Sequence, residues 1–174
     1  MRIALDAMGG DYAPAVNVEG AIETVDDLEG IEIILVGNES SIKGELDGKR
    51  YPPDRILIRH ASQVVSMDES PSVAIRKKRD SSIVRGIELV KNGEADAFVS
   101  AGHSGVIMAT AILLLGASSG VDRPAIAAIM PTLKVPFVLI DAGANIYCKP
   151  ENLLQFALMG SAYCRVILER SEPK

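Results

Sequence analysis

The first part of the chain alternates short apolar runs with a segment of helical periodicity. Residues 3–5 and 31–36 are apolar runs of strand length. Between them, after Pro14, apolar residues recur every three or four positions, as on one face of a helix. These positions are Val18, Ile22, Val25 and Leu28. This order of strand, helix and strand predicts a parallel sheet with a crossover helix.

The middle of the chain repeats the same alternation. A strand is predicted at residues 55–59 and another at residues 97–100. Between them, Ser70 before Pro71 and the pair Ser81-Ser82 are typical of helix starts, because a serine hydroxyl can accept a hydrogen bond from a free N–H of the first turn. Two helices are therefore expected between these strands.

The last part adds an unusually apolar helix, two strands and a final helix. Residues 104–115 are apolar on nearly every face, as expected of a helix packed inside a larger body. Strands are predicted at residues 125–130 and 135–140, and a helix at residues 152–170. The pattern predicts an α/β fold, a three-layer α/β/α sandwich with a mostly parallel sheet. No flexible linker divides the chain, so we expect residues 1–174 to form a single domain.

Composition narrows the function classes. The net charge of -5 argues against a generic nucleic-acid binder, which should be basic. Two cysteines suggest a reducing compartment, and two histidines make a His-rich metal site improbable. The longest apolar stretch, Val106 to Leu115, is about half the roughly 20 residues that cross a bilayer. We expect no nucleic acid, no metal and no spanning helix.

Three turns rich in Gly or Ser follow predicted strands, at residues 6–11, 100–105 and 141–145. In open α/β sheets such strand ends form the ligand crevice. Glycine lets backbone N–H groups approach an anion, and a following helix N-terminus adds partial positive charge. Glycine also serves such turns without any ligand. Neither a P-loop nor a complete GxGxxG is present, so the turns favour a phosphate or oxyanion site over a nucleotide cofactor.

Four ordered motifs resemble a known family. They are residues 5–11 with Ala13-Pro14, Ser70-Pro71 followed by the basic run and Ser81-Ser82, residues 100–105, and residues 141–145 with 148–151. The chain resembles, over essentially its whole length, the phosphate acyltransferase of bacterial phospholipid synthesis, or acyl-carrier-protein:phosphate transacylase. The resemblance implies a fold like that of phosphotransacetylases and of isocitrate and isopropylmalate dehydrogenases. It also implies that these residues are the N-terminal part of a longer family chain.

The resemblance implies transfer of a long-chain acyl group from acyl carrier protein to inorganic phosphate. It implies a cytoplasmic homodimer with peripheral contact at the inner face of the membrane, and no cofactor. The catalytic candidates are His103, Asn145 and Lys149. The candidates for phosphate binding are Gly9, Gly10, Ser81, Ser82, Gly102, Ser104, Gly105 and Gly143. The candidates for carrier-protein binding are Arg76, Lys77, Lys78 and Arg79.

Each candidate has a structural alternative. His103 could protonate the departing thiolate or be a polar turn residue bonded to backbone. Family members usually carry Asn and Thr where this chain has His103 and Ser104. Lys149 could hold phosphate or be an exposed residue beside a helix start. The basic run could recognise the acidic carrier protein or form a solvated helix face. Carboxylates at the strand ends could orient donors, bind a cation or simply form turns; they are Asp6, Asp11 and Asp141.

The sequence is also compatible with two other functions. The chain could be a non-catalytic module that docks carrier protein or a membrane surface, because the basic run needs no completed active site. It could instead carry out phosphotransacetylase-like transfer with coenzyme A. Substrate competition would distinguish this transfer with coenzyme A from transfer out of carrier protein.

Overall fold

The structure is a computed structural model that describes residues 1–143, 145 and 147–173. These residues divide into two compact units, Met1–Gly116 and Ala117–Lys174. The sequence predicted a single domain over residues 1–174, and that grouping stays a prediction.

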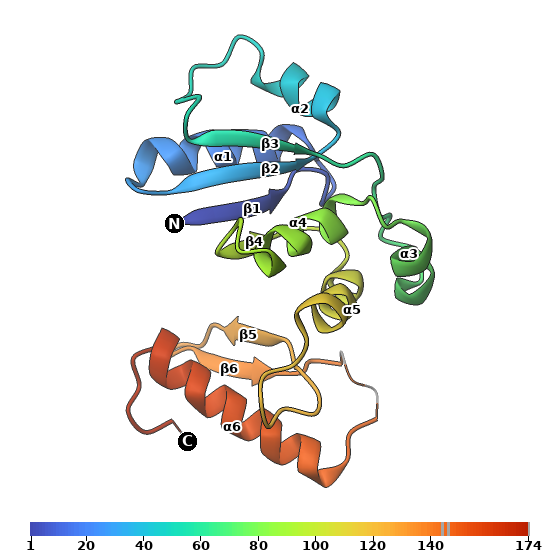
Figure 1. Cartoon of the computed structure of the whole chain (residues 1–174). Helices are drawn as coiled ribbons and strands as arrows, with labels where there is room; N and C mark the ends of the chain where they lie inside the picture. Colours follow the sequence, from blue (N-terminus) through green and yellow to red (C-terminus); the bar gives the residue numbers. More distant parts are fainter. Residues whose placement is uncertain (144, 146, 174) are drawn as a thin grey trace. The chain divides into compact units, whose positions relative to one another are not determined.

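The first unit contains a four-stranded sheet in which every pair of neighbours is parallel (Figure 1). The strand order is β3-β2-β1-β4. The strands are β1 (Arg2–Asp6), β2 (Glu32–Gly37), β3 (Ile56–His60) and β4 (Ala97–Val99). All four had been predicted within two residues of these bounds, and the mostly parallel sheet is confirmed.

Helices cover both faces of this sheet. The helices of the first unit are α1 (Ala15–Asp27), α2 (Glu39–Leu46), α3 (Pro71–Lys77), α4 (Ser82–Lys91) and α5 (Ser104–Leu115). Helices α1 and α2 pack on one face and α4 on the other, which gives the expected three layers. The sequence analysis missed α2, although Asn38 caps it by accepting a hydrogen bond from the Ser41 N–H at 3.0 Å.

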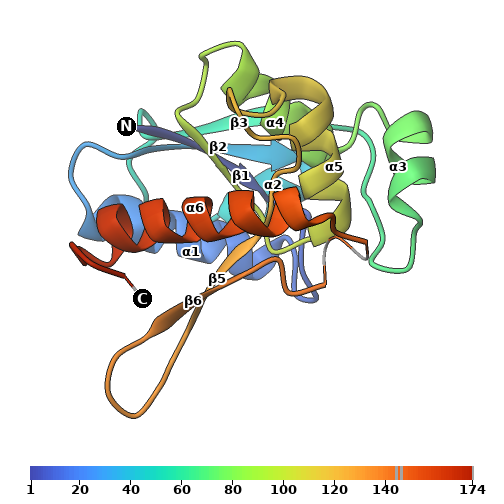
Figure 2. The ribbon, with the colours of Figure 1, turned by 90° about the horizontal axis from the view of Figure 1, so that it is seen from below.

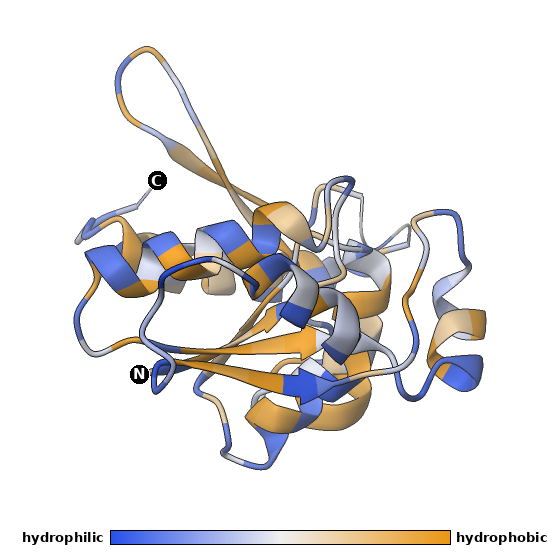
Figure 3. Cartoon of the chain, turned by 90° about the horizontal axis from the view of Figure 1, so that it is seen from above, coloured by the Kyte–Doolittle hydropathy of each residue, from blue (hydrophilic) through white to orange (hydrophobic). Residues whose placement is uncertain are grey.

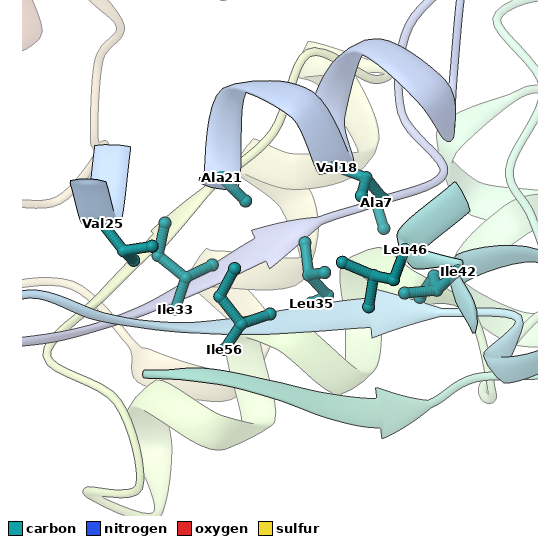
Figure 4. Packing of buried hydrophobic residues seen from close by; sticks show 9 residues of the cluster. All are labelled: Ala7, Val18, Ala21, Val25, Ile33, Leu35, Ile42, Leu46 and Ile56. Carbon is teal, nitrogen blue, oxygen red and sulfur yellow. The ribbon is translucent and has the colours of Figure 1, made fainter. Parts of the chain in front are cut away.

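The core follows from strands that are apolar on both faces, as parallel strands between helices must be. Ile33 and Leu35 join the cluster beneath α1 and α2, which also contains Val18, Ala21, Val25, Ile42, Leu46 and Ile56 (Figure 4). Ile34 and Val36 point to the opposite cluster, beneath α4. Figure 3 shows the resulting apolar colour along these strands.

One arginine side chain caps the C-terminal end of α1. Arg55, directly before β3, donates from Nη1 to the Val25 carbonyl at 2.6 Å and from Nη2 to the Leu28 carbonyl at 2.5 Å. Its Nε donates to the Ile31 carbonyl at 2.9 Å. The Val25 and Leu28 carbonyls lie where a helix leaves its last acceptors without intrahelical partners, and Ile31 directly precedes β2. We call this arrangement the Arg55 clasp.

The apolar helix α5 has the predicted bounds but not the predicted burial. Of its residues, only Val106 and Thr110 are buried in this chain. Ile112, Leu113 and Leu115 are between 39% and 67% exposed. None of the helices formed by the described residues combines the length and apolar character needed to cross a bilayer.

The second unit is an antiparallel hairpin with one helix. Strands β5 (Ala127–Met130) and β6 (Phe137–Ile140) pair with each other, and α6 (Pro150–Ile167) packs against β6 (Figure 2). Gly160 permits this approach, since a Cβ there would lie 3.0 Å from Ile140 Cγ1. Both strands had been predicted, but their antiparallel pairing had not.

Candidate functional site

The ends of two neighbouring strands bring two of the predicted turns together. Strands β1 and β4 are parallel neighbours, so the turns that follow them meet at one edge of the sheet. Asp6, only 1% exposed, joins the two turns. Its Oδ2 accepts a hydrogen bond from Ser100 Oγ at 2.7 Å, and its Oδ1 accepts one from the Met8 N–H at 3.0 Å. A buried carboxylate is tolerable here because each oxygen has a donor.

Two more side-chain contacts complete this Asp6 network. Ser100 Oγ accepts a hydrogen bond from the Gly102 N–H at 3.0 Å. Asn17, on α1, donates from Nδ2 to the carbonyls of Asp6, Ala7 and Gly9 at 3.2, 3.2 and 2.8 Å. Since Asn17 has only two amide hydrogens, these three contacts are shared. The network fixes the shape of both turns through contacts within the first unit.

Gly9 lies too close to the network to carry a side chain. A Cβ at Gly9 would lie 2.6 Å from Asp6 Oδ2, 2.7 Å from the Gly102 nitrogen and 3.0 Å from Ser100 Oγ. All three atoms are held in one chain of hydrogen bonds, from the Gly102 N–H to Ser100 Oγ and from Ser100 Oγ to Asp6 Oδ2, so they cannot simply move aside. The glycine of the first turn is therefore needed for close packing of the two turns.

Several backbone donors around this edge are unused. The N–H groups of Gly9 and Gly10 make no hydrogen bond to the part of the chain that the structure describes. The same is true of Ser104 and Gly105, in the first turn of α5. A helix N-terminus and free N–H groups together favour binding of an anion. The Gly102 N–H, which the sequence suggested as a further donor, is instead taken by Ser100 Oγ.

His103 is the cap of α5. Its Nδ1 accepts from the Val106 N–H at 3.4 Å, and its Nε2 lies 3.0 Å from the Glu69 carbonyl oxygen. A carbonyl oxygen can only accept, so Nε2 carries the proton and the ring is in its Nε2–H tautomer. The ring also lies against Gly105, where a Cβ would be 3.1 Å from His103 Cε1. Of the two readings of the sequence, the geometry supports a polar residue bonded to backbone; the catalytic role stays a prediction.

The basic run divides into two kinds of residue. Lys78 is half-buried, forms an ion pair with Glu69 and donates to the Val64 carbonyl at 2.6 Å. Arg76, Lys77 and Arg79 are exposed and have no ion pair with any described residue. These three form the exposed part of the run, and Lys78 has a structural contact that the sequence did not reveal.

Ser81 and Ser82, predicted to bind phosphate, lie in the buried start of α4. They are 0% and 2% exposed, and Ser81 Oγ accepts from the Val84 N–H at 3.4 Å as the helix cap. Next to them, Asp80 accepts hydrogen bonds from Ser62 Oγ at 2.5 Å and from Arg85 Nε at 2.7 Å. The structure therefore gives this motif a role in holding α4, and phosphate binding at these hydroxyls stays a prediction.

We expect Asp80 to make the free energy of unfolding of the chain depend on pH. The Ser62 hydroxyl, followed by the Arg85 guanidinium, lowers the pKa of Asp80 well below its ordinary value of 3.8. A lowered pKa in the folded state stabilises the fold above the ordinary value, and this contribution is lost as the pH falls below it. Asp80→Asn should therefore lose less free energy of unfolding than the parent chain between about pH 4 and about pH 2. Denaturant unfolding at several pH values measures this, and Ser62→Ala should shift the slope in the same direction. Equal slopes for parent and Asp80→Asn would contradict the assignment.

The third turn lies in the second unit. Asp141 adopts a positive φ of 58° at the end of β6. Its Oδ1 accepts from Asn145 Nδ2 at 2.8 Å, and its Oδ2 accepts from the Asn145 N–H at 3.2 Å. Asn145 Nδ2 also lies 3.4 Å from the Pro124 carbonyl, and the Gly143 N–H donates to the Asp141 carbonyl at 2.7 Å. The amide donors of Asn145 thus already have acceptors, so a role as phosphate donor would require an exchange of partners.

Lys149 lies at the start of α6 with an exposed side chain. Its backbone N–H donates to Asn152 Oδ1 at 3.0 Å, while its ammonium group has no hydrogen bond to a described residue. Among those residues, no three His, Cys, Asp or Glu side chains are arranged to hold a metal ion. His103 and Lys149 belong to different units, so each is described only within its own unit.

The sequence did not predict the hydrogen bonds that join the turns at the ends of β1 and β4. Asn17 gave no signal, because it lies within α1, outside the turn at residues 6–11 that its side chain contacts. Ser100 belongs to a turn that was singled out, yet its link to Asp6 spans 94 residues of sequence. Of the network, only the suggestion that Asp6 orients donors had been made, and its hydrogen bonds agree with that suggestion.

The sequence matches the model of a protein family described as "Fatty acid synthesis protein" over residues 1–174. It is 50% identical over 174 residues to a phosphate acyltransferase of Alkaliphilus oremlandii, covering 100% of this chain and 52% of that protein. It is 52% identical to a phosphate acyltransferase of Thermodesulfovibrio yellowstonii, covering 100% of this chain and 50% of that protein. The chain thus spans about half the length of these relatives.

Solved structures show the same fold at low sequence identity. A phosphotransacetylase from Streptococcus pyogenes matches with a TM-score of 0.67 at 18% identity, covering 98% of this chain and 55% of that one. A phosphotransacetylase from Staphylococcus aureus matches with a TM-score of 0.64 at 19% identity, covering 94% and 52%. The α/β sandwich predicted from the sequence is therefore confirmed.

Proposed function

Since this chain belongs to the phosphate acyltransferase family of fatty acid synthesis proteins, we propose that it serves the transfer of a long-chain acyl group from acyl carrier protein to inorganic phosphate. The product is an acyl phosphate for phospholipid synthesis. The proposed setting is the cytoplasm, with peripheral contact at the membrane and assembly as a homodimer. The observation that carries the proposal is the edge where β1 and β4 end, with its unused N–H groups held by the Asp6 network.

The chemistry needs positioning more than a protein nucleophile. A phosphate oxygen attacks the thioester carbonyl carbon, the carbonyl oxygen becomes an oxyanion, and the C–S bond then breaks. The carrier-protein thiolate leaves and takes up a proton, and the acyl group remains on phosphate. Phosphate is already an anion near neutral pH, so fixed N–H donors for the phosphate and the oxyanion contribute most. Gly9, Gly10, Ser104 and Gly105 offer such donors.

Recognition of the carrier protein is proposed for the exposed part of the basic run. Acyl carrier protein is acidic, and opposite charge steers the encounter of two proteins. Arg76, Lys77 and Arg79 are exposed near the end of α3, which packs beside α5. Helix α3 would thus receive a carrier protein close to the donors at the start of α5.

The experiment is an assay of phosphate-dependent release of carrier-protein thiol from a long-chain acyl thioester. It compares this chain with the chain extended to the length of its relatives. Release that requires phosphate supports the transferase. Release by the extended chain alone would mean that the residues described here form part of the site.

Two outcomes of the same assay would favour the other functions. No release from either chain, together with binding of acyl carrier protein, would identify a non-catalytic docking module. Faster transfer from an acyl coenzyme A than from the carrier-protein thioester would identify a phosphotransacetylase-like enzyme.

Arg76→Ala should lower the rate of thiol release at subsaturating carrier protein. Lys91→Ala, which removes an exposed lysine at the end of α4, serves as the matched control.

His103 variants separate capping from catalysis. Both His103→Ala and His103→Asn remove the imidazole, but asparagine is a good helix cap and an amide donor. We expect His103→Ala to lower the free energy of unfolding by about 0.5–2 kcal/mol and His103→Asn to lower it less. If the His103→Asn chain still releases thiol, a hydrogen-bond donor suffices at this position. A loss of release in a stably folded His103→Asn chain would show that the imidazole proton is needed.

A further inference from the structure

One carbonyl oxygen holds the only ring proton of His103. The Nε2–H donates to the Glu69 carbonyl at 3.0 Å, and Nδ1 accepts at 3.4 Å from the Val106 N–H, which also donates to the His103 carbonyl at 3.0 Å. The ring therefore has no unused nitrogen toward a ligand. For His103 to donate to phosphate or to a departing thiolate, the Nε2–H must exchange the Glu69 carbonyl for the substrate.

The position of that carbonyl is set by the side chain of the same residue. Glu69 Oε1 accepts from the Ser66 N–H at 2.8 Å and forms the ion pair with Lys78. These contacts lower the pKa of Glu69, with the Lys78 ammonium as the largest cause, so the carboxylate stays charged near neutral pH. Lys78 is held in turn by the Val64 carbonyl at 2.6 Å. The loop before α3 is thereby closed by charge-assisted hydrogen bonds, which are stronger than neutral ones.

The start of α3 also packs against the turn that carries His103. A Cβ at Gly105 would lie 3.2 Å from Pro71 Cγ as well as 3.1 Å from His103 Cε1. Ala74 of α3 shares a buried cluster with Val106 of α5. The loop that presents the Glu69 carbonyl is thus fixed at both ends, by Lys78 on one side and by packing on α5 on the other.

From these contacts we infer that Glu69 and Lys78 are positioning residues for His103: their ion pair places the Glu69 carbonyl where it holds the His103 Nε2 proton ready for the substrate. This inference rests on the proposed function for its chemical meaning. It also changes the role of Lys78, which the sequence had assigned to carrier-protein binding. The partner surface on α3 then consists of the exposed basic residues, and Lys78 connects α3 to His103.

The chain offers a direct measurement because it has only two histidines, His60 and His103. Correlation of ring nitrogens with ring protons by NMR, in the 15N-histidine-labelled chain, reports the tautomer of each ring without substrate. We expect the parent chain to show His103 as a pure Nε2–H tautomer. Lys78→Met and Glu69→Gln should move its two nitrogen shifts toward the averaged values of a ring that exchanges tautomers, and Lys78→Arg should keep the parent values.

The matched control breaks an ion pair beside the other histidine. Lys43 pairs with Glu39, whose N–H donates to His60 Nδ1 at 3.3 Å. Lys43→Met should leave the His103 shifts unchanged. The inference is overturned if His103 already averages between tautomers in the parent chain, or if its shifts are unchanged in both Lys78→Met and Glu69→Gln; where one of these variants fails to fold, the other decides. Because no substrate is present, this result is independent of the thiol-release assay.

Discussion

Gly9→Ala should destabilise the chain by roughly 1–3 kcal/mol, the usual cost of forcing extra atoms into a packed region. A methyl group at Gly9 would be 2.6 Å from Asp6 Oδ2 and 2.7 Å from the Gly102 nitrogen, far inside normal contact distance. Relief requires the turn after β1 and the turn after β4 to separate. The same movement displaces the free N–H groups at this edge, so binding of inorganic phosphate should be lost as well.

Gly20→Ala is the matched control for this prediction. Gly20 lies within α1, where an added Cβ meets nothing within 4 Å. Alanine favours a helix over glycine, so this substitution should stabilise the chain by about 0.5–1 kcal/mol. Denaturant unfolding measures both variants, and titration with phosphate measures binding. A Gly9→Ala chain as stable as the parent would contradict the packing of the two turns.

Asp6→Ala is expected to have the other large effect. It leaves two donors without their acceptor, the Met8 N–H and the Ser100 hydroxyl, in a region where Asp6 is only 1% exposed. An unsatisfied buried donor costs about 1–3 kcal/mol. Since the Ser100 hydroxyl can turn to another acceptor, the Met8 N–H should account for more of the loss in the free energy of unfolding.

The Asp6 prediction can be tested by a double-mutant cycle with Ser100→Ala. Because Ser100 Oγ bridges Asp6 Oδ2 and the Gly102 N–H, the two substitutions should not be additive. Asp11→Ala, an exposed carboxylate in the same turn, serves as the control and should change stability by less than about 0.5 kcal/mol. Additive effects of Asp6→Ala and Ser100→Ala would mean that the bridge does not couple the two turns.

Local patterns were sufficient to predict most elements of the fold. Strands β1 to β4 are short apolar runs, and Ser70 and Ser81 stand where α3 and α4 begin. Helix α2 was missed because its sequence, Glu39 to Leu46, contains two serines and a glycine and buries only Ile42 and Leu46. The antiparallel pairing of β5 with β6 could not be predicted either, because the pairing partner of a strand depends on tertiary structure.

The candidate site was harder to predict than the fold. Glycine turns mark strand ends in the sequence, but hydrogen-bond partners such as Asp6 with Ser100, or His103 with Glu69, are distant along the chain. The four basic residues at 76–79 look equivalent in sequence, yet among the described residues only Lys78 forms an ion pair with a carboxylate. Which charged side chain is free for a partner is therefore decided by the fold.

The Arg55 clasp described above makes an edge strand and a distant helix end part of one cooperative unit. Strand β3 is at the edge of its sheet, where opening by local unfolding costs least. When the start of β3 detaches, the guanidinium leaves with it, and the carbonyls of Val25, Leu28 and Ile31 lose their common donor. The end of α1 and the turn that leads into β2 should therefore open together with the edge strand, while the strand ends that form the candidate site stay closed.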